Sequence, residues 1–159
     1  MPKVVVMQDA DGAGPQQAGL ARYVTVLERL TPETLPELRA VTAPDVRFKD
    51  PFHDVSGRGA MLAVFERMFM DVQDLTFSVH HAGLAADGET ALLRWTLSGR
   101  VRALNGRPWA VEGMSEVRLD AGGLVTAHID YWDAASSLYE RLPVIGWLLR
   151  LIRRRIAVL

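Results

Sequence analysis

The spacing of apolar residues divides the first part of the chain into helices. Apolar positions three or four residues apart predict a helix over residues 17–30 and a second, shorter helix that begins near Thr31. A third helix is expected to begin at Ser56-Gly57. Its buried stripe should consist of Met61, Leu62, Phe65, Met68 and Phe69. Residues 1–16 show no useful period and are predicted to form a flexible arm.

Strict alternation of apolar and polar residues begins after Asp71 and is typical of strands. The alternating runs cover residues 75–79, 93–97, 109–119 and 125–131. Turn pairs separate them at Asp87-Gly88, Asn105-Gly106 and Gly122-Gly123. We expect a four-stranded antiparallel meander followed by two helical stretches, 134–142 and 145–156. Helices first and a curved sheet afterwards indicate an α+β domain with helices on one face of the sheet.

One further strand, at residues 46–50, carries a candidate functional residue. Val46 and Phe48 share its apolar face, and the same alternation directs Asp50 inward. Pro51 then closes the strand. A carboxylate on an inward face costs free energy unless it is paired or hydrogen-bonded. The alternative is a strand-end aspartate that accepts bonds from its own turn, and the pattern leaves both interpretations open.

The last alternating run raises the question of which of its faces is buried. One face carries His128, Asp130 and Trp132, and the other carries Val125, Ala127, Ile129 and Tyr131. Binary patterning alone places the second set in the core and the first in solvent. A sheet covered on both faces would bury both sets. A histidine and an aspartate two apart on a strand can share a site as base and orienter.

Composition and charge exclude several classes of protein. With 159 residues and about half of them apolar, the chain is expected to form one globular domain. The net charge of −1 gives no electrostatic case for nucleic-acid binding. Four histidines without ligand-like spacing and no cysteines argue against a metal site, and no cofactor motif is present, so we expect no cofactor. The short apolar run near the N-terminus is no signal peptide, so a cytoplasmic protein is expected.

The C-terminal residues differ in charge from the rest of the chain. Residues 141–159 contain five arginines and no acidic residue, whereas residues 1–140 sum to −6. Residues 143–159 are predicted to form a basic amphipathic helix. Its apolar band is expected to contain Trp147, Leu148, Leu151, Ile152 and Ile156. Such a helix can lie on the anionic inner face of a membrane, or it can pack on its own domain or on a partner subunit.

The order of these elements resembles a known family. The Phe-x-Asp-Pro strand at 48–51 and the Asp-Tyr-Trp-Asp sequence at 130–133 are similar to those of the SnoaL-like branch of the nuclear transport factor 2-like superfamily. The resemblance covers residues 18–140 and implies a cone, in which a curved sheet wraps around helices and leaves an apolar pocket at its wide end. We therefore assign the cone domain to residues 17–142.

The resemblance also implies roles for particular residues. In the ketosteroid isomerases of this superfamily, the oxyanion-hole tyrosine corresponds to Tyr23 and the general base to Asp50. Ser115 occupies the position of the second oxyanion donor. His128 and Trp132 fall on pocket-lining positions, which contradicts the binary pattern. Cyclases and epoxide hydrolases of the same fold use an acidic residue for which Asp130 can stand. The expected catalytic residues are Asp50, His128, Tyr23 and Asp130, and the expected ligand-binding residues are Ser115, Trp132, Phe48, Phe52 and Trp109.

Two functions are compatible with this site. The first is a cofactor-free isomerase, cyclase or dehydratase that acts on a small hydrophobic molecule, with Asp50 as the residue most needed for activity. The second is a protein that binds a ligand without catalysis or acts as an accessory at a membrane surface. A homodimer through the outer face of the sheet is also expected, because apolar residues such as Leu92 and Leu93 lie on both faces.

Overall fold

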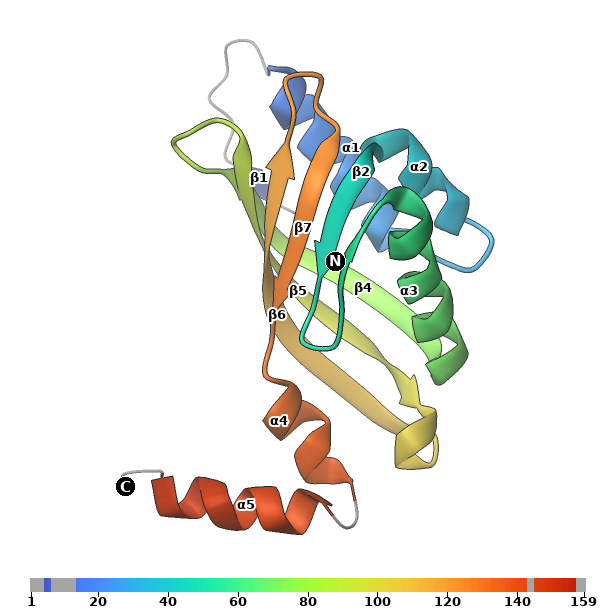
Figure 1. Cartoon of the computed structure of the whole chain (residues 1–159), viewed down its shortest axis with the longest axis vertical. Coiled ribbons are helices and arrows are strands. Elements are labelled where there is room, and N and C mark those ends of the chain that lie inside the picture. The colour runs from blue at the N-terminus through green and yellow to red at the C-terminus, as the bar shows by residue number, and fades with distance from the viewer. Residues whose placement is uncertain (1–4, 7–13, 143–144, 157–159) are drawn as a thin grey trace.

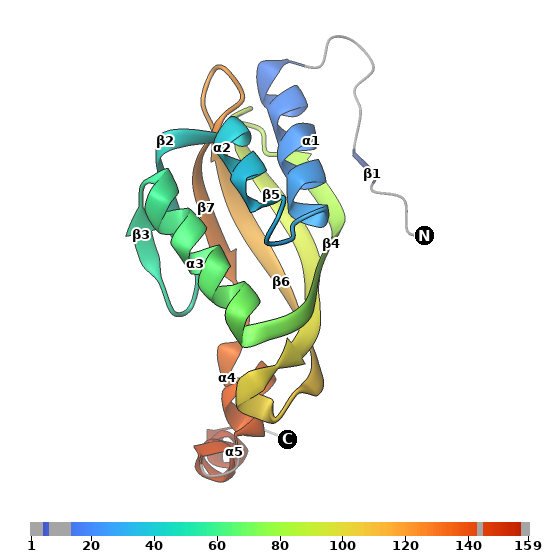
Figure 2. The ribbon, with the colours of Figure 1, turned by 90° about the vertical axis from the view of Figure 1, so that its right-hand side faces the viewer.

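A strongly curved sheet that holds helices on its concave side forms the main body of the protein (Figures 1 and 2). The computed structural model describes residues 5–6, 14–142 and 145–156. Its strands are β1 (Val5–Val6), β2 (Thr42–Lys49), β3 (Asp54–Ser56), β4 (Val72–Leu84), β5 (Thr90–Val101), β6 (Arg107–Leu119) and β7 (Val125–Tyr131). Its helices are α1 (Pro15–Glu28), α2 (Leu38–Val41), α3 (Arg58–Asp71), α4 (Ala134–Ser137) and α5 (Ile145–Ile156), with 3₁₀ turns η1 (Leu35–Glu37), η2 (Arg102–Leu104) and η3 (Tyr139–Arg141). The α+β prediction is confirmed.

The antiparallel meander predicted for the second half of the chain is present as strands β4 to β7. In the part of the chain that the structure describes, the sheet has the order β1-β4-β5-β6-β7-β2-β3. Strand β2 joins the meander in parallel with β7, with Phe48 beside His128, and the short strand β3 pairs with β2. Neither pairing was predicted, because no local pattern shows which distant strand will be a neighbour.

The concave face of the sheet is filled by the apolar stripes of α1 and α3. On α1 these residues follow the helical period, and they are Leu20, Tyr23, Val24 and Leu27. Gly19 lets α1 approach the β6–β7 turn, because an added Cβ would lie 2.1 Å from the carbonyl oxygen of Gly123. Any larger side chain at either glycine would push α1 away from the sheet. The helix thus holds Tyr23 against the base of β7.

Three predicted helices have the wrong boundaries. The second helix was expected to begin near Thr31, but regular structure begins only at η1. Pro36 explains the delay, because inside a helix its ring would clash with the carbonyl four residues earlier. The stretch 134–142 is not one helix either: α4 ends at Ser137 and η3 follows. Helix one begins at Pro15, two residues earlier than predicted.

A β-bulge in β7 reverses the face on which its residues lie. Leu119 of β6 pairs with Val125, but the preceding residue Arg118 pairs with Ala127, so Thr126 is an extra residue in β7. Because side chains alternate with a period of two, one extra residue sends every later position to the other face. Val125 and His128 are therefore both buried, although they are three residues apart.

Two terminal segments lie apart from this core. Val5–Val6 pairs with β4, a contact that the sequence did not predict, and residues 1–4 and 7–13 of the expected arm lie outside the described residues. Helix α5 lies at the opposite end of the molecule, beyond α4 (Figure 1). None of the helices in the described ranges combines the length and the hydropathy that crossing a bilayer requires.

Candidate functional site

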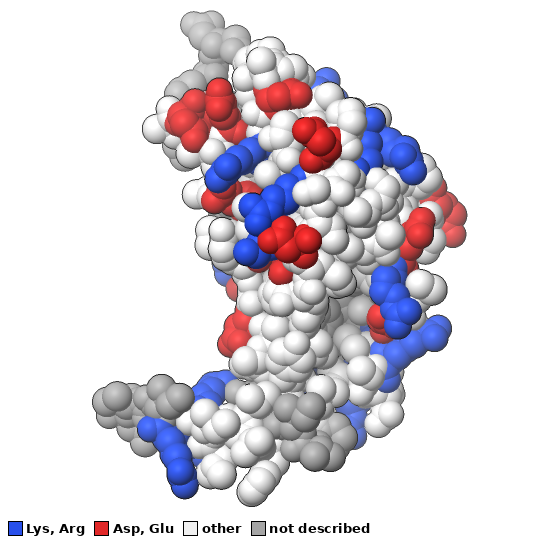
Figure 3. Space-filling view, viewed as in Figure 1, with Lys and Arg blue, Asp and Glu red and all other residues white. Residues whose placement is uncertain are grey.

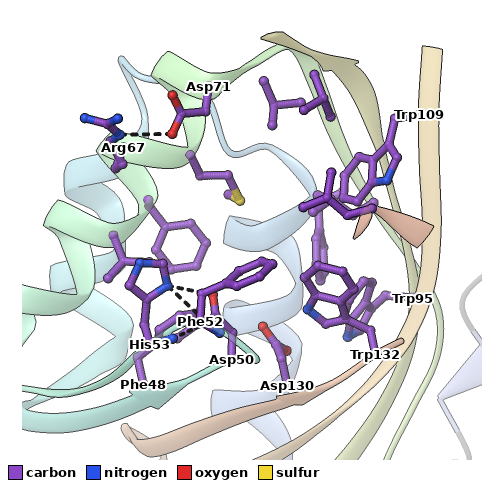
Figure 4. Close-up of a pocket in the computed structure, with 18 of the residues that line it drawn as sticks. Phe48, Asp50, Phe52, His53, Arg67, Asp71, Trp95, Trp109, Asp130 and Trp132 are labelled. Carbon is purple, nitrogen blue, oxygen red and sulfur yellow. Dashed lines mark hydrogen bonds and ion pairs between the residues drawn. The ribbon is translucent and has the colours of Figure 1, made fainter. Parts of the chain in front are cut away.

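A cavity of about 370 Å³ occupies the inside of the cone, between α3 and the sheet. This volume is within the range typical of small-molecule sites. Seven aromatic residues line the cavity, and they are Phe48, Phe52, Phe65, Phe77, Trp95, Trp109 and Trp132. Figure 4 shows the three tryptophans along one wall and Phe52 across the space from them. The walls are therefore apolar, and the few polar groups among them decide the chemistry.

Asp130 is the polar group that the protein supports most extensively. Its Oδ1 accepts hydrogen bonds from the Ser115 hydroxyl at 2.5 Å and from His128 Nε2 at 2.7 Å. The other ring nitrogen of His128 bonds the Tyr23 hydroxyl at 2.7 Å. Trp95 Nε1 donates to Ser115 Oγ at 2.7 Å. The five side chains form one continuous network that runs from α1 through β7 and β6 to β5.

With a neutral His128 ring, the network has one consistent assignment of protons. Burial raises the pKa of Tyr23 well above its usual value, and the charge of Asp130 raises it further. Tyr23 therefore stays protonated, and its hydroxyl donates a hydrogen bond to His128 Nδ1. His128 then carries its own proton on Nε2 and donates to Asp130. An indole N–H can only donate, so Ser115 accepts from Trp95 and gives its hydroxyl proton to Asp130.

The remaining carboxylate oxygen of Asp130 is open to the cavity. Oδ1 receives the bonds from both Ser115 and His128, and among the described residues no enclosed side-chain nitrogen or oxygen lacks a partner. Oδ2 has no such partner, so it must be accessible from the pocket that Asp130 lines. Asp130 is thus a fixed hydrogen-bond acceptor that points into an apolar space (Figure 4).

Asp50 also lines the pocket, but its own turn holds it in place. Its Oδ1 accepts bonds from the backbone N–H groups of Phe52 at 2.7 Å and His53 at 2.6 Å. The ring nitrogen Nδ1 of His53 lies 3.0 Å from the same oxygen. The alternating pattern predicted an inward Asp50, and the Asp-Pro pair indicated a turn cap. In the structure Asp50 both lines the pocket and caps its own turn.

At its mouth the pocket is bordered by an ion pair on α3. Arg67 Nε lies 2.9 Å from Asp71 Oδ2, and both side chains are largely exposed. Because this pair is internally neutral, the formal charge that faces the cavity comes from Asp50 and Asp130 (Figure 4). Within the described ranges, no three His, Cys, Asp or Glu side chains are placed to hold a metal ion.

Most of the residues expected at the site line the pocket. They are Phe48, Asp50, Phe52, Trp109, His128, Asp130 and Trp132. The inward direction of His128 and Asp130 contradicts the binary pattern and agrees with the resemblance. Tyr23 and Ser115 do not line the cavity: both are buried behind it, and their hydroxyls bond His128 and Asp130.

Sequence reasoning missed two functional candidates, Trp95 and His53. Trp95 is on an alternating run between Leu93 and Leu97, and this parity alone could have placed it on the inner face. No sequence signal linked Trp95 to Ser115, because the two residues meet only when β5 pairs with β6. His53 follows the Asp-Pro-Phe turn directly, and its proximity to Asp50 could have been foreseen from the turn itself.

The curved sheet and the apolar pocket at its open end define the class of α+β cone proteins. Residues 7–128 match the SnoaL-like domain family, so the chain belongs to this family. This finding confirms the resemblance noted in the sequence. A comparison with curated proteins found no match.

Solved structures confirm the cone fold. A putative SnoaL-like polyketide cyclase from Jannaschia sp. CCS1 is 16% identical, with a TM-score of 0.67 over 81% of this chain and 93% of that chain. A ketosteroid isomerase-like protein from Catenulispora acidiphila, in complex with trimethylamine, is 18% identical with a TM-score of 0.64 over 79% and 93%. A Mycobacterium tuberculosis protein, in complex with estradiol-17β-hemisuccinate, is 16% identical with a TM-score of 0.61 over 76% and 95%. At these identities the similarity concerns the fold alone.

Proposed function

We propose that this SnoaL-like protein binds a small, mainly apolar molecule inside the cone and moves a proton on it through Asp130, without a metal or organic cofactor. The observation that carries the proposal is the Asp130 carboxylate, held on one oxygen by Ser115 and His128 and open to the apolar cavity on the other. A carboxylate in an apolar, water-poor pocket is a stronger base toward carbon acids than one in water.

The geometry suggests a division of roles that differs from the one expected from the sequence. Both nitrogens of His128 are occupied, by Tyr23 and Asp130, so His128 acts through Asp130 as a positioning residue. Tyr23 and Ser115 would orient this pair and do not hold a substrate oxygen. Asp50 remains a candidate for the second acid–base group, because it lines the same pocket. Two titratable groups at one cavity favour catalysis over binding alone.

Family members of this fold supply the range of reactions to consider. The Jannaschia relative is described as a putative polyketide cyclase, and another structure of this shape is described as an epoxide hydrolase/cyclase-like enzyme of pyran ring formation. The estradiol hemisuccinate in the Mycobacterium protein supports a hydrophobic ring compound as the ligand. Isomerisation, cyclisation and dehydration all need proton transfer at carbon or oxygen, and this is the step assigned to Asp130.

A probe of carbon deprotonation tests the proposal without knowledge of the natural substrate. Removal of the C3 proton of 5-nitrobenzisoxazole breaks its N–O bond and releases a coloured nitrophenolate. We expect the protein to exceed an equal concentration of acetate, and Asp130→Asn to reduce the rate about a hundredfold or more. The control is Asp120→Asn, because Asp120 caps the β6–β7 turn outside the pocket and asparagine can still accept its bonds.

Two results would contradict proton transfer by Asp130. One is a parent rate no higher than that of acetate, and the other is an unchanged rate in Asp130→Asn. Binding alone would then be the better description. Binding is measured separately by tryptophan quenching, because three of the four tryptophans line the pocket. Trp147→Phe removes the fourth, which lies exposed on α5.

A homodimer through the outer face of the sheet is part of the proposal. Leu92, Met114 and Tyr131 are half exposed on β5, β6 and β7, and Met114 pairs directly with Tyr131. Exposed apolar residues that gather on one sheet face are typical of interfaces. Sedimentation at micromolar concentration should give a dimer, and Met114→Glu should give a monomer. A monomeric parent protein would refute this part.

Contact of α5 with an anionic membrane surface is a separate candidate function. Trp147, Leu148, Leu151 and Ile152 are exposed along one side of α5, and the side chain of Ile156 lies outside the described residues. The helix also carries four arginines, at positions 150 and 153–155, and Figure 3 shows basic side chains at this end of the molecule. Vesicles that contain phosphatidylglycerol should co-sediment with the protein, and vesicles of phosphatidylcholine should not. The double variant Trp147→Ser/Leu151→Ser should abolish the difference. Equal binding by parent and variant would exclude the lipid role.

A further inference from the structure

We propose that the ligand of this pocket is an organic cation, namely a protonated or quaternary amine on an apolar body. The inference rests on the proposed binding function and names the class of molecule that the pocket selects. Three features of the described residues support it: the placement of two carboxylates, the scarcity of free donors, and the arrangement of the aromatic rings.

The first feature is that the sheet register brings two carboxylates together. Strands β2 and β7 run in parallel, with Phe48 beside His128 and Lys49 beside Ile129. The next residues in the two segments are Asp50 and Asp130, on the same inner face as Phe48 and His128. Neighbouring strands are about 4.8 Å apart, so the two carboxyl groups face the same small volume. Like charges at such positions repel each other, and a cation between them relieves the repulsion.

No lysine or arginine of the described residues occupies this place. The Arg67 guanidinium pairs with Asp71 at the mouth, on α3. His53 Nδ1 lies 3.0 and 3.1 Å from the two oxygens of Asp50, and His128 bonds Asp130 from within the wall, which leaves Asp130 Oδ2 for a ligand. Figure 4 shows Asp50 and Asp130 on the floor of the pocket and Arg67 and Asp71 at its far edge. The negative end of the cavity is therefore available to a ligand.

The second feature is that several N–H donors of the lining residues are already used, although Trp132 Nε1 has no hydrogen-bond partner among the described residues. Trp95 Nε1 donates to Ser115, and Trp109 Nε1 donates to the backbone carbonyl of Ser137 at 2.9 Å. Both nitrogens of His128 are bonded. A ligand carboxylate would meet two aspartates and few donors, which is unfavourable. A ligand with positive charge or N–H donors matches the acceptors that the pocket offers.

The third feature is a wall of aromatic rings beside the carboxylates. Phe52 and Trp132 have centroids 5.4 Å apart and meet at 72°, and Trp109 meets Trp132 at 6.1 Å and 71°. Rings in such edge-to-face contact present faces in different directions, so a group in the cavity beside them can meet a ring face. An alkylammonium group within about 6 Å of an aromatic face is attracted by the ring quadrupole, most strongly for tryptophan.

The test compares a cation with its neutral isostere. Phenyltrimethylammonium and tert-butylbenzene have the same shape and differ by nitrogen in place of carbon. Binding is measured by tryptophan quenching in Trp147→Phe, in which all three remaining tryptophans line the pocket. We expect the cation to bind at least tenfold more tightly. In Asp50→Asn/Asp130→Asn on the same background, the preference should fall to about threefold or less, and tert-butylbenzene should bind as before.

The possible results separate the two proposals. Retained binding of tert-butylbenzene shows that the double variant is folded and that its pocket is intact. Equal affinity of the parent for both probes would overturn the cation inference and leave the apolar pocket standing. An undiminished cation preference in the double variant would overturn the role of the carboxylates. Binding of neither probe would overturn the inference together with the proposed function. Asp120→Asn, which removes one charge outside the pocket, should retain the parent preference.

Discussion

The two carboxylates of one pocket are held by different means. Asp50 is held by the backbone of the two residues Phe52 and His53 that follow it in its own turn. Asp130 is held by Ser115 and His128, and behind them by Tyr23, which is 105 residues away from His128 in sequence. The turn that holds Asp50 needs only contacts between neighbouring residues of the chain. The network forms only when α1, β6 and β7 are all in place.

This difference determines how strongly each aspartate is affected when a neighbouring residue is substituted. A turn-capped carboxylate loses little when a neighbour is changed, because backbone N–H groups are always present. A carboxylate fixed by side chains depends on every member of its network, because a buried group that loses its partner costs its full desolvation energy. The predictions below test this contrast in order of expected effect.

The largest effect is expected from His128. Replacement by phenylalanine keeps an aromatic ring but removes both bonds of a nearly fully buried side chain, and it leaves Tyr23 and one acceptor site of Asp130 without a partner. We expect a loss of about 3 kcal/mol in urea unfolding. The matched change is His53→Phe in the turn of Asp50, where the ring is 39% exposed. That variant should lose less than about 1 kcal/mol. Equal losses would show that the two sites are not different.

Gly113→Ala should have the next largest effect, through the side of the network that holds Ser115. A Cβ at Gly113 would lie 2.4 Å from the ring of Trp95, so the indole must move away from Ser115. Overpacking of this kind costs about 2 kcal/mol. Gly83→Ala is the control, because Gly83 is also in a strand and has open space around its missing Cβ. A stable Gly113→Ala with an unchanged tryptophan emission spectrum would contradict the prediction.

Tyr23→Phe should cost about 1–2 kcal/mol at neutral pH, because it leaves His128 Nδ1 without its partner. The cost should shrink in alkali. Burial holds the pKa of Tyr23 well above 10.0, so above this pH the unfolded chain loses the tyrosine proton while the folded protein keeps it. The stability that depends on Tyr23 is therefore complete below pH 10 and declines as the pH rises.

The Tyr23→Phe variant lacks this alkaline loss. The difference in unfolding free energy between parent and variant should therefore fall by about 1.4 kcal/mol for each pH unit above 10. Urea unfolding of parent and variant at pH 9 and pH 11 measures the change. Tyr131→Phe serves as the control, since Tyr131 is mostly exposed. A constant difference at both pH values would mean that Tyr23 titrates as in the unfolded chain.

The smallest effect is expected from Asp50→Ala, on the other side of the comparison. The change removes an acceptor from two backbone N–H groups, those of Phe52 and His53. Loss of such a cap costs about 1 kcal/mol. If the variant loses 3 kcal/mol or more, Asp50 is part of a tertiary network and its turn is not self-sufficient. Asp50→Asn should be nearly neutral in stability, because asparagine can still accept both bonds.

The sequence predicts the fold better than the site, because local contacts leave a pattern in the sequence and long-range contacts do not. Helix α1 and strands β4 to β7 follow from local periods of apolar residues, and the Asp50 turn follows from an Asp-Pro pair. The parallel pairing of β2 with β7 and the contact of Tyr23 with His128 depend on residues far apart in the chain, and no period records them. The position of Asp130 was obtained only from resemblance, since alternation pointed it toward solvent.

Because of the bulge at Thr126, the protein should tolerate deletion of that residue but not deletion of Ile129, three positions later. Because Arg118 pairs with Ala127 and Leu119 with Val125, loss of the Thr126 codon would leave every later pairing in β7 as it is. Loss of the Ile129 codon would make His128 and Asp130 adjacent and send them to opposite faces. Among descendants of this sequence, gaps should therefore accumulate before residue 127 and be absent between residues 128 and 130.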